Sequence, residues 1–147
     1  MKRSIFPVLA LLMTAVALPF DAVGGPAGED DARYGMQASR EGKLEAALRY
    51  FKRAINAGGL KGNELAAVYV NRGLTYYRLN KPKKAIVDYN TALKMTPRNA
   101  YAFNNRGLAY EKLGRRSEAI RDYRRALKID STLWRTKVNL ERLGIKP

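Results

Sequence analysis

The feature that most constrains the fold is a stretch of sequence that occurs twice. The ten residues VNRGLTYYRL at 70–79 return as NNRGLAYEKL at 104–113. When residues 66–99 are aligned with residues 100–133, fourteen positions are identical. A fixed period of this length is typical of a solenoid, in which each unit stacks on its neighbours to bury its apolar face.

Apolar residues within each unit recur three or four positions apart in two runs, which predicts two helices joined by a short turn. Asn80 and Gly114 lie between the runs, where either residue can take the left-handed conformation that ends a helix. Pro82 suits the first turn of the second helix. Asn63 and Asn99 are predicted to cap the leading helices.

The small residues of each unit predict close contact between its two helices. Gly73 and Gly107 are expected where the helices approach most closely, and Ala85 and Ala119 where the partner helix crosses. Asp88 recurs at the repeat period as Asp122, and pairing with nearby basic side chains explains both carboxylates better than acid–base chemistry does.

These positions resemble the tetratricopeptide repeat (TPR) family. The resemblance rests on Tyr69, Gly73, Tyr76, Ala85, Tyr89, Ala92 and Pro97 in one unit, and on Phe103, Gly107, Tyr110, Ala119, Tyr123 and Ala126 in the next. Ser131 stands where the family expects proline. A comparison of residues 28–65 with residues 66–103 adds an earlier, degenerate unit that keeps Gly35, Gly42, Ala47, Phe51 and Ala54.

The resemblance implies an all-α fold, a TPR solenoid of about three helix-turn-helix repeats plus a C-terminal capping helix. The expected organisation is a signal peptide at 1–24, a linker at 25–31, a TPR domain at 32–143 and a tail at 144–147. Within the domain we expect a degenerate repeat at 28–65, repeats at 66–99 and 100–133, and the capping helix at 134–143.

The N-terminal residues predict export. A charged start, an apolar run and small residues follow one another over residues 1–20, as in a secretory signal, with cleavage expected near 22–24 or near 15–17. An uncleaved membrane anchor is the alternative. The expected location is periplasmic or secreted. Because cysteine is absent, packing alone must hold the fold, and a lipoprotein anchor is excluded.

The resemblance implies that the leading helix of each unit lines a concave surface. Arg33, Asn71, Asn105 and Asn139 fall at one equivalent position, and a row of amides can bind the backbone of an extended peptide. The full predicted groove is Arg33, Asn71, Leu74, Tyr77, Arg78, Tyr101, Asn105, Leu108 and Asn139. The alternative is that the motif NRG, with Asn and Arg on an exposed face, was copied by duplication and binds nothing.

Some members of the family hold a partner's terminal carboxylate with lysine, arginine and asparagine on these helices. This chain has Ala67 and Tyr101 at the matching early-helix positions instead of lysine. The resemblance still allows Arg33 and Asn71 to contact a terminal carboxylate.

The net charge of +15 favours anionic partners. Arg116, Arg121, Arg124 and Arg125 are predicted to form a basic patch on a trailing helix, open to an anionic cell-wall polymer or a lipid surface. A solvated face that binds nothing is the alternative. Nucleic acid is disfavoured, because aromatic residues do not alternate with these arginines as a platform for single-stranded nucleic acid would require.

Catalysis is not expected. Histidine and cysteine are absent, which removes the usual bases, nucleophiles and metal ligands, so no catalytic residue, metal or cofactor is predicted. The sequence therefore predicts a non-enzymatic adaptor that binds an extended segment of another envelope protein, with self-association as a further expectation. The alternative function is electrostatic attachment to an anionic polymer or membrane surface.

Overall fold

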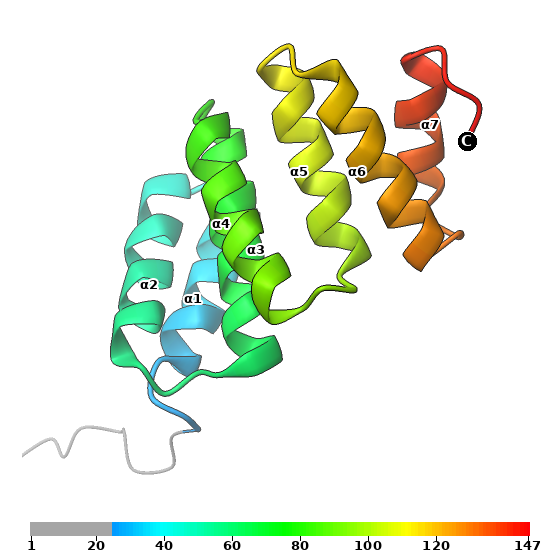
Figure 1. Cartoon of the computed structure of the whole chain (residues 1–147). Coiled ribbons are helices and arrows are strands. Elements are labelled where there is room, and N and C mark those ends of the chain that lie inside the picture. The colour runs from blue at the N-terminus through cyan, green and yellow to red at the C-terminus, as the bar shows by residue number, and fades with distance from the viewer. Residues whose placement is uncertain (1–24) are drawn as a thin grey trace, which may run out of the picture.

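The computed structural model describes residues 25–147, which form seven α-helices and no strand (Figure 1). The predictions of a signal peptide, its cleavage and a membrane anchor concern residues outside this range. No helix within 25–147 is long and apolar enough to cross a membrane. The helices are α1 (Glu29–Arg40), α2 (Leu44–Ala57), α3 (Gly62–Arg78), α4 (Pro82–Met95), α5 (Ala100–Lys112), α6 (Arg116–Ile129) and α7 (Trp134–Arg142).

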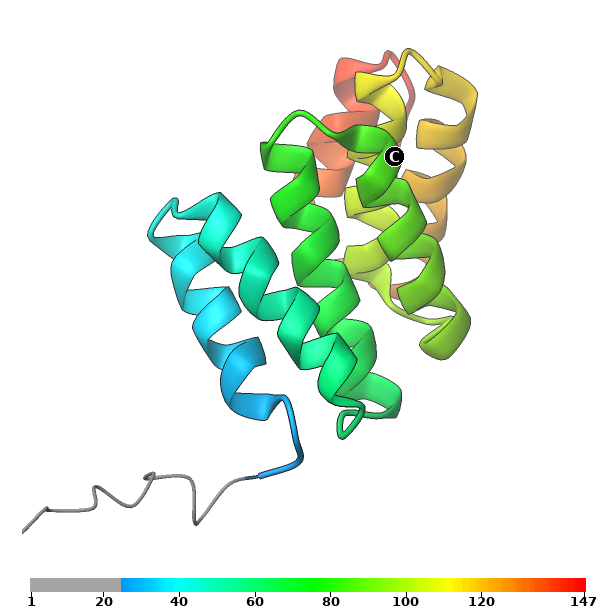
Figure 2. The same ribbon diagram turned by 90° about the vertical axis from the view of Figure 1, so that its left-hand side faces the viewer.

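The helices stack in chain order as antiparallel pairs, α1 with α2, α3 with α4 and α5 with α6, and α7 covers α6 at the end (Figures 1 and 2). Each helix packs on the next one, and the leading helices α1, α3 and α5 also contact one another in sequence. This arrangement confirms the predicted all-α solenoid with a C-terminal capping helix.

An aromatic ring packed on a glycine holds each pair of helices together. Phe51, Tyr89 and Tyr123 are fully buried and lie against Gly35, Gly73 and Gly107, respectively. A Cβ atom at Gly73 would lie 2.8 Å from Cε1 of Tyr89, closer than real Cβ contacts come. The prediction that glycine permits the close approach of the two helices is confirmed.

The helix ends agree with the sequence at all but one of the positions predicted. Asn80 and Gly114 have φ values of 58° and 72°, and α4 begins at Pro82. The side chain of Asn99 accepts a hydrogen bond of 2.9 Å from the backbone N–H of Ala102, as a cap should. The prediction for Asn63 was wrong, because α3 begins at Gly62, after extended Lys61, so Asn63 lies within the helix and no side chain caps it.

The first helix begins within the predicted linker at 25–31. Gly28 takes a left-handed conformation, and α1 starts at Glu29, ahead of the predicted domain start at 32. Glu29, Asp30 and Asp31 place negative charge in the first turn, where it stabilises the positive end of the helix dipole. The capping helix ends at Arg142, just short of the predicted end at 143.

Each of the two similar units contains a buried ion pair between its helices. Arg72 donates two hydrogen bonds of 2.7 and 2.8 Å to Asp88, and Arg106 donates two of the same lengths to Asp122. The bonds to the aspartates raise the pKa of both guanidinium groups. The predicted pairing of the two aspartates is confirmed, and Arg72 does not extend into solvent as the alternative interpretation of the NRG motif assumed.

Candidate functional site

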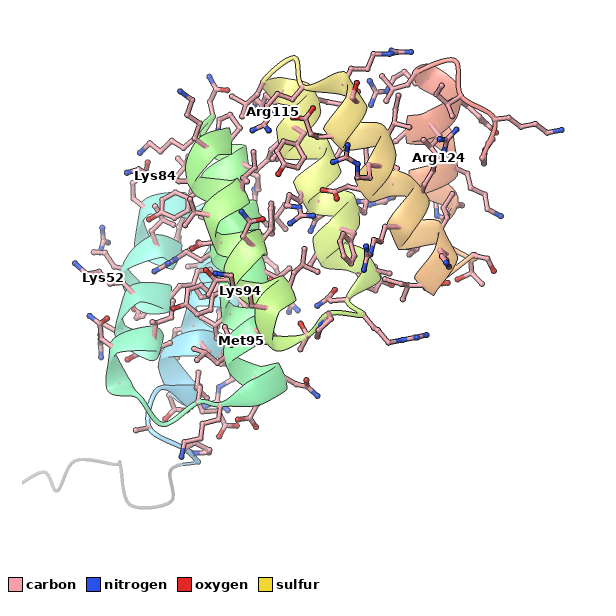
Figure 3. All side chains as sticks on the ribbon, viewed as in Figure 1. Lys52, Lys84, Lys94, Met95, Arg115 and Arg124 are labelled. Atoms are coloured by element: carbon pink, nitrogen blue, oxygen red, sulfur yellow. The ribbon has the colours of Figure 1, made fainter. Side chains whose placement is uncertain are left out.

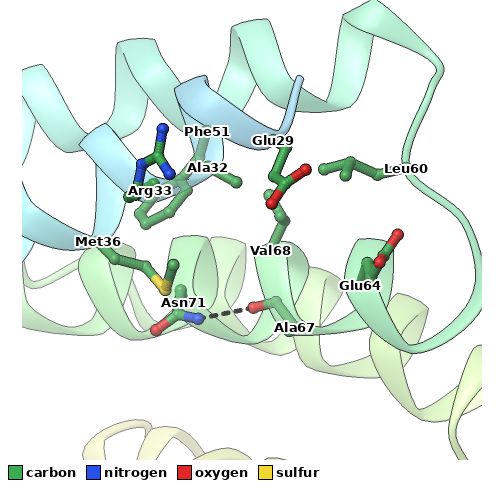
Figure 4. Close-up of a pocket in the computed structure, with 10 residues that line it drawn as sticks. All are labelled: Glu29, Ala32, Arg33, Met36, Phe51, Leu60, Glu64, Ala67, Val68 and Asn71. Carbon is green, nitrogen blue, oxygen red and sulfur yellow. Dashed lines mark hydrogen bonds between the residues drawn. The ribbon is translucent and has the colours of Figure 1, made fainter. Parts of the chain in front are cut away.

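A cavity of about 290 Å³ opens between the leading helices α1 and α3 (Figure 4). Arg33 and Asn71, two of the four predicted row positions, line it together. The small side chains of Ala32 and Ala67 leave space between the two helices at this place. The full lining is Glu29, Ala32, Arg33 and Met36 of α1, Phe51 of α2, Leu60, and Glu64, Ala67, Val68 and Asn71 of α3.

The polar groups of this cavity are partly engaged within their own helices. Arg33 donates to Asp30 one turn earlier, and both side chains are exposed. The amide nitrogen of Asn71 donates a hydrogen bond of 2.9 Å to the carbonyl of Ala67 (Figure 4). Its amide oxygen has no hydrogen-bond donor among residues 25–147, so it is free to accept one from a ligand.

The charges beside the cavity are mixed, and its floor is apolar. Glu29 and Glu64 contribute carboxylates from opposite walls, whereas Met36, Phe51 and Val68 contribute apolar surface. The guanidinium of Arg33 is already paired with a carboxylate. A buried apolar side chain matches this lining better than an anionic group does.

Asn105, the third row position, lines a second hollow of about 360 Å³ between α5 and α7, and Asn139, the fourth, lies outside that lining. Asn104 lines the same hollow, and its amide nitrogen donates to the oxygen of Asn105 at 3.2 Å. The oxygen of Asn104 in turn accepts from Thr136 at 2.8 Å and from Asn139 at 3.4 Å. The four row positions therefore lie in two separate groups, with Arg33 and Asn71 in one and Asn105 and Asn139 in the other.

Several predicted groove residues tie the leading helices to one another. Arg78 of α3 donates to the backbone carbonyl of Ser39 in α1 at 2.6 Å. Lys112, the counterpart of Arg78 in the next unit, places its ammonium 4.7 Å from the ring centre of Tyr77 and donates to the Tyr77 carbonyl at 3.4 Å. These side chains hold the inner surface together.

The remaining apolar groove residues differ in exposure. Tyr101 is 64% exposed, whereas Leu74 and Tyr77 are half-buried. Leu108 packs against the buried cluster that contains Tyr123 and Leu140, so it belongs mainly to the contact with the capping helix. Of this set, Tyr101 is the side chain most accessible to a ligand.

Models of the TPR repeat match residues 73–114 and 100–133. The TPR domain of Arabidopsis OM64 is 30% identical over 80% of this chain and 94% of that domain, with a TM-score of 0.75. This chain belongs to the tetratricopeptide repeat family. No curated protein sequence matches it.

Two further TPR structures resemble this one and contain peptides. The second TPR domain of human RPAP3, in complex with the HSP70 peptide SGPTIEEVD, is 28% identical over 79% of this chain and 93% of that chain, with a TM-score of 0.70. The second TPR of Spaghetti (RPAP3), bound to the HSP90 peptide SRMEEVD, is 29% identical over 71% of this chain and 93% of that chain, with a TM-score of 0.65.

Residues outside the predicted groove complete the cavity between α1 and α3. Glu64 and Ala67 precede Asn71 by seven and four positions, so helical periodicity places all three on one face of α3. Met36 follows Arg33 by three positions on α1 for the same reason. Periodicity along one helix therefore identifies these residues, whereas comparison between units does not.

The four arginines of the predicted basic patch on α6 do not all lie in one hollow. Arg124 and Arg125 line one hollow of about 640 Å³, but Arg98 and Lys128 join them there. Arg116 instead donates to the backbone carbonyl of Leu143 after the capping helix. Arg121 is exposed on α6 but does not line the hollow. The hollow therefore contains two of the four predicted arginines, together with Lys128 of α6 and Arg98 from the connection between α4 and α5.

The acidic side chains of the TPR domain do not form a metal site. Within residues 25–147 no group of three or more acidic or histidine side chains could hold a metal ion. Glu111 accepts a hydrogen bond of 2.8 Å from each of the two terminal guanidinium nitrogens of Arg142, and it also accepts one from the hydroxyl of Tyr123. Burial, followed by this hydrogen bond, raises the pKa of Tyr123.

Proposed function

We propose that this TPR protein is a non-enzymatic adaptor that binds an extended segment of a partner protein along its leading helices. The observation that carries the proposal is the cavity between α1 and α3, where Arg33 and Asn71 meet beside apolar surface. Peptide complexes of the RPAP3 TPR domains, at 28% and 29% identity, support this use of the fold.

The lining of the cavity suggests what it accepts. An apolar side chain of the partner would enter beside Met36 and Val68, and its backbone N–H would donate to the free amide oxygen of Asn71. Glu29 and Glu64 would favour a lysine or arginine next to that apolar residue. These carboxylates disfavour a terminal carboxylate at the same place. The segment would therefore be internal to the partner, in contrast to peptides that end in EEVD.

A second contact would form at Tyr101 and Asn105, where the hollow between α5 and α7 is open. The aromatic ring of Tyr101 offers apolar contact and its hydroxyl a polar one, a combination that is frequent in binding surfaces. An extended segment that touches both sites would run across α3, past Leu74 and Tyr77.

The proposed setting is the cell envelope, with the protein in the periplasm or secreted. The charged, apolar and small residues of 1–20, in the order of a secretory signal, support this. The partner would then be another envelope protein. Self-association through the same inner surface would place a second copy in competition with that partner.

A capture experiment tests the proposal. Wild-type protein and the Asn71→Ala/Asn105→Ala variant are used as baits against an envelope fraction, with Asn56→Ala, an exposed asparagine on α2, as the control. We expect the double variant to lose most of the captured partner, and the control and moderate salt to leave capture intact. Equal capture by all three baits would contradict binding at these sites.

A further inference from the structure

The C-terminal half of α6 carries a hollow that is independent of the inner surface. Its lining is Pro97 and Arg98 of the α4–α5 connection and Arg124, Arg125, Lys128 and Ile129 of α6, which enclose about 640 Å³. We refer to it as the α6 hollow. Arg124 extends from α6 in Figure 3. All four cationic residues are exposed, so an incoming ligand can reach them.

The four cations of the α6 hollow have no acidic partner in the described part of the chain. None of them forms an ion pair within residues 25–147. Of the nearest acidic residues in sequence, Asp122 is buried against Arg106. Asp130 accepts hydrogen bonds from the backbone and hydroxyl of Thr132 and lines a neighbouring hollow together with Arg98, but it forms no ion pair there. Like charges around one hollow repel each other, and an anion placed between them relieves that repulsion.

One of the four cations is held in place by an aromatic ring. The guanidinium carbon of Arg125 lies 5.3 Å from the ring centre of Phe103, a cation–π contact, and the guanidinium forms no ion pair within residues 25–147. Phe103 is buried in the contact between α5 and α6, so this arginine is anchored to the core. A guanidinium fixed in advance binds an anion with less loss of side-chain entropy.

The preceding unit shows that the fold does not require these arginines. Positions 121, 124 and 125 on α6 correspond to Val87, Asn90 and Thr91 on α4 when the two units are aligned. The two helices pack against their partners through the same glycine, aromatic and ion-pair contacts. Since α4 stacks equally well without arginine at these places, packing does not explain the three arginines on α6.

We propose that the α6 hollow binds a multivalent phosphate ligand, with Arg124 and Arg125 contacting the phosphate oxygens and Arg98 and Lys128 adding positive charge from the sides. The planar fork of a guanidinium matches two oxygens of a phosphate, which makes arginine the better of the two cations for this contact. The same chemistry is offered by the headgroup phosphates of an anionic lipid surface and by a free polyphosphate. The site does not depend on the peptide proposed for the inner surface.

The test replaces two arginines of α6 with the residues found at the equivalent positions of α4. Arg124→Asn/Arg125→Thr copies the residues of α4 into α6. The control, Lys52→Asn/Lys83→Ser, also removes two positive charges, from exposed positions on α2 and α4 outside the hollow. Binding is measured by calorimetry with sodium tripolyphosphate and by sedimentation with phosphatidylglycerol vesicles, both at low salt. Circular dichroism checks that each variant is folded.

We expect the arginine variant to lose at least about tenfold in affinity, and the control to change by no more than about twofold. If the arginine variant loses affinity for tripolyphosphate but not for the vesicles, the ligand is a free phosphate compound. If it loses affinity for the vesicles alone, the ligand is a lipid headgroup. Equal losses in the two variants would show a response to net charge only and would overturn the site. Failure of wild-type protein to bind either probe would overturn it as well.

A measurement on the unmodified protein covers the case in which the arginine variant fails to fold. In a ¹⁵N NMR titration of the wild type with tripolyphosphate, we expect the backbone signals of Arg98, Arg124, Arg125 and Lys128 to shift most. Equal shifts at Lys84 and Lys94 on α4 would contradict a distinct site on α6 (Figure 3).

Discussion

The second and third units of the stack, residues 66–99 and 100–133, share the contacts that join their two helices but differ on the outer face of the second helix. Inside, the contacts repeat: Gly73 and Gly107 each lie against a buried tyrosine, and each unit has an Arg–Asp pair with the same bond lengths. Outside, Val87, Asn90 and Thr91 are replaced by three arginines. Duplicated units keep what stacking requires, so the positions where they diverge indicate where each has acquired its own role.

The first unit extends the comparison, because it keeps the stack with a different contact. The positions of the Arg–Asp pair are occupied there by Tyr34 and Tyr50, whose ring centres lie 5.7 Å apart. The aromatic pair joins α1 to α2 where the ion pair joins α3 to α4. The two helices of a unit therefore need a complementary pair of side chains at these positions, and either an ion pair or an aromatic pair serves.

The largest expected effect comes from breaking one of these pairs. Arg106→Ala leaves the carboxylate of Asp122, only 4% exposed, without its cation, and it also removes a 2.6 Å hydrogen bond to Asn90. We expect the free energy of unfolding in urea to fall by about 3–5 kcal/mol. The double change Arg106→Tyr/Asp122→Tyr, which copies the first unit, should cost less. A larger loss for the double change would show that the two chemistries are not interchangeable.

A smaller loss is expected where a methyl group is added at the tightest contact of the third unit. In Gly107→Ala, the new Cβ would lie 2.7 Å from Cε1 of Tyr123, which is fully buried and cannot move away easily. We expect a net loss of about 1–3 kcal/mol, because the crowding outweighs the better helix propensity of alanine. Thermal unfolding followed by circular dichroism measures it. An increase in stability would mean that the two helices can separate at no cost.

The two buried tyrosines are expected to respond differently to loss of the hydroxyl. The hydroxyl of Tyr123 donates to Glu111, whereas that of Tyr89 is buried without a partner in the described residues, because Tyr77 stands at the position of Glu111. Tyr123→Phe should cost about 1–2 kcal/mol, and Tyr89→Phe should be neutral or stabilising. Equal losses in urea unfolding would contradict the difference between the units.

The smallest effect is a difference in alkaline stability. Burial, followed by the nearby charge of Asp88, raises the pKa of Tyr89 above its ordinary value of 10.0. Above pH 10 the unfolded chain releases this proton before the folded chain does, so stability falls as the pH rises. Between pH 10 and 11 we expect the free energy of unfolding of Tyr89→Phe to fall less steeply than that of the wild type. The two slopes should differ by about 1 kcal/mol per pH unit. Parallel pH curves for wild type and variant would show that Tyr89 ionises normally.

The sequence predicted the stack because the contacts that build it recur at a fixed spacing. Glycine, aromatic and carboxylate positions repeat between units, so a single alignment locates them all. The prediction failed at the start of α1, where residues 25–31 contain glycine, proline and charges typical of a linker. There the helix gains its stability from the acidic first turn and from packing on α2, neither of which shows in periodicity.

The candidate site was harder to predict, because it depends on contacts between units. The repeat period places Asn71 and Asn105 at equivalent positions. However, the amide oxygen of Asn105 accepts a hydrogen bond from its neighbour Asn104, and the earlier unit has Val70 at the position of Asn104. Arg78 contacts the carbonyl of Ser39, which lies too far away in the sequence for any local pattern to reveal the contact. Arg98 reaches the α6 hollow from a connection, outside any helical period.

Site-specific photo-crosslinking tests binding at the inner surface most directly. A benzophenone amino acid is placed at Glu64, which is exposed at the cavity, and in a control at Val87, which is 62% exposed on the outer face of α4. Irradiation of cells that express each variant should give a discrete protein adduct at position 64 and none at position 87. An adduct at position 87 with none at position 64 would contradict a partner held between α1 and α3.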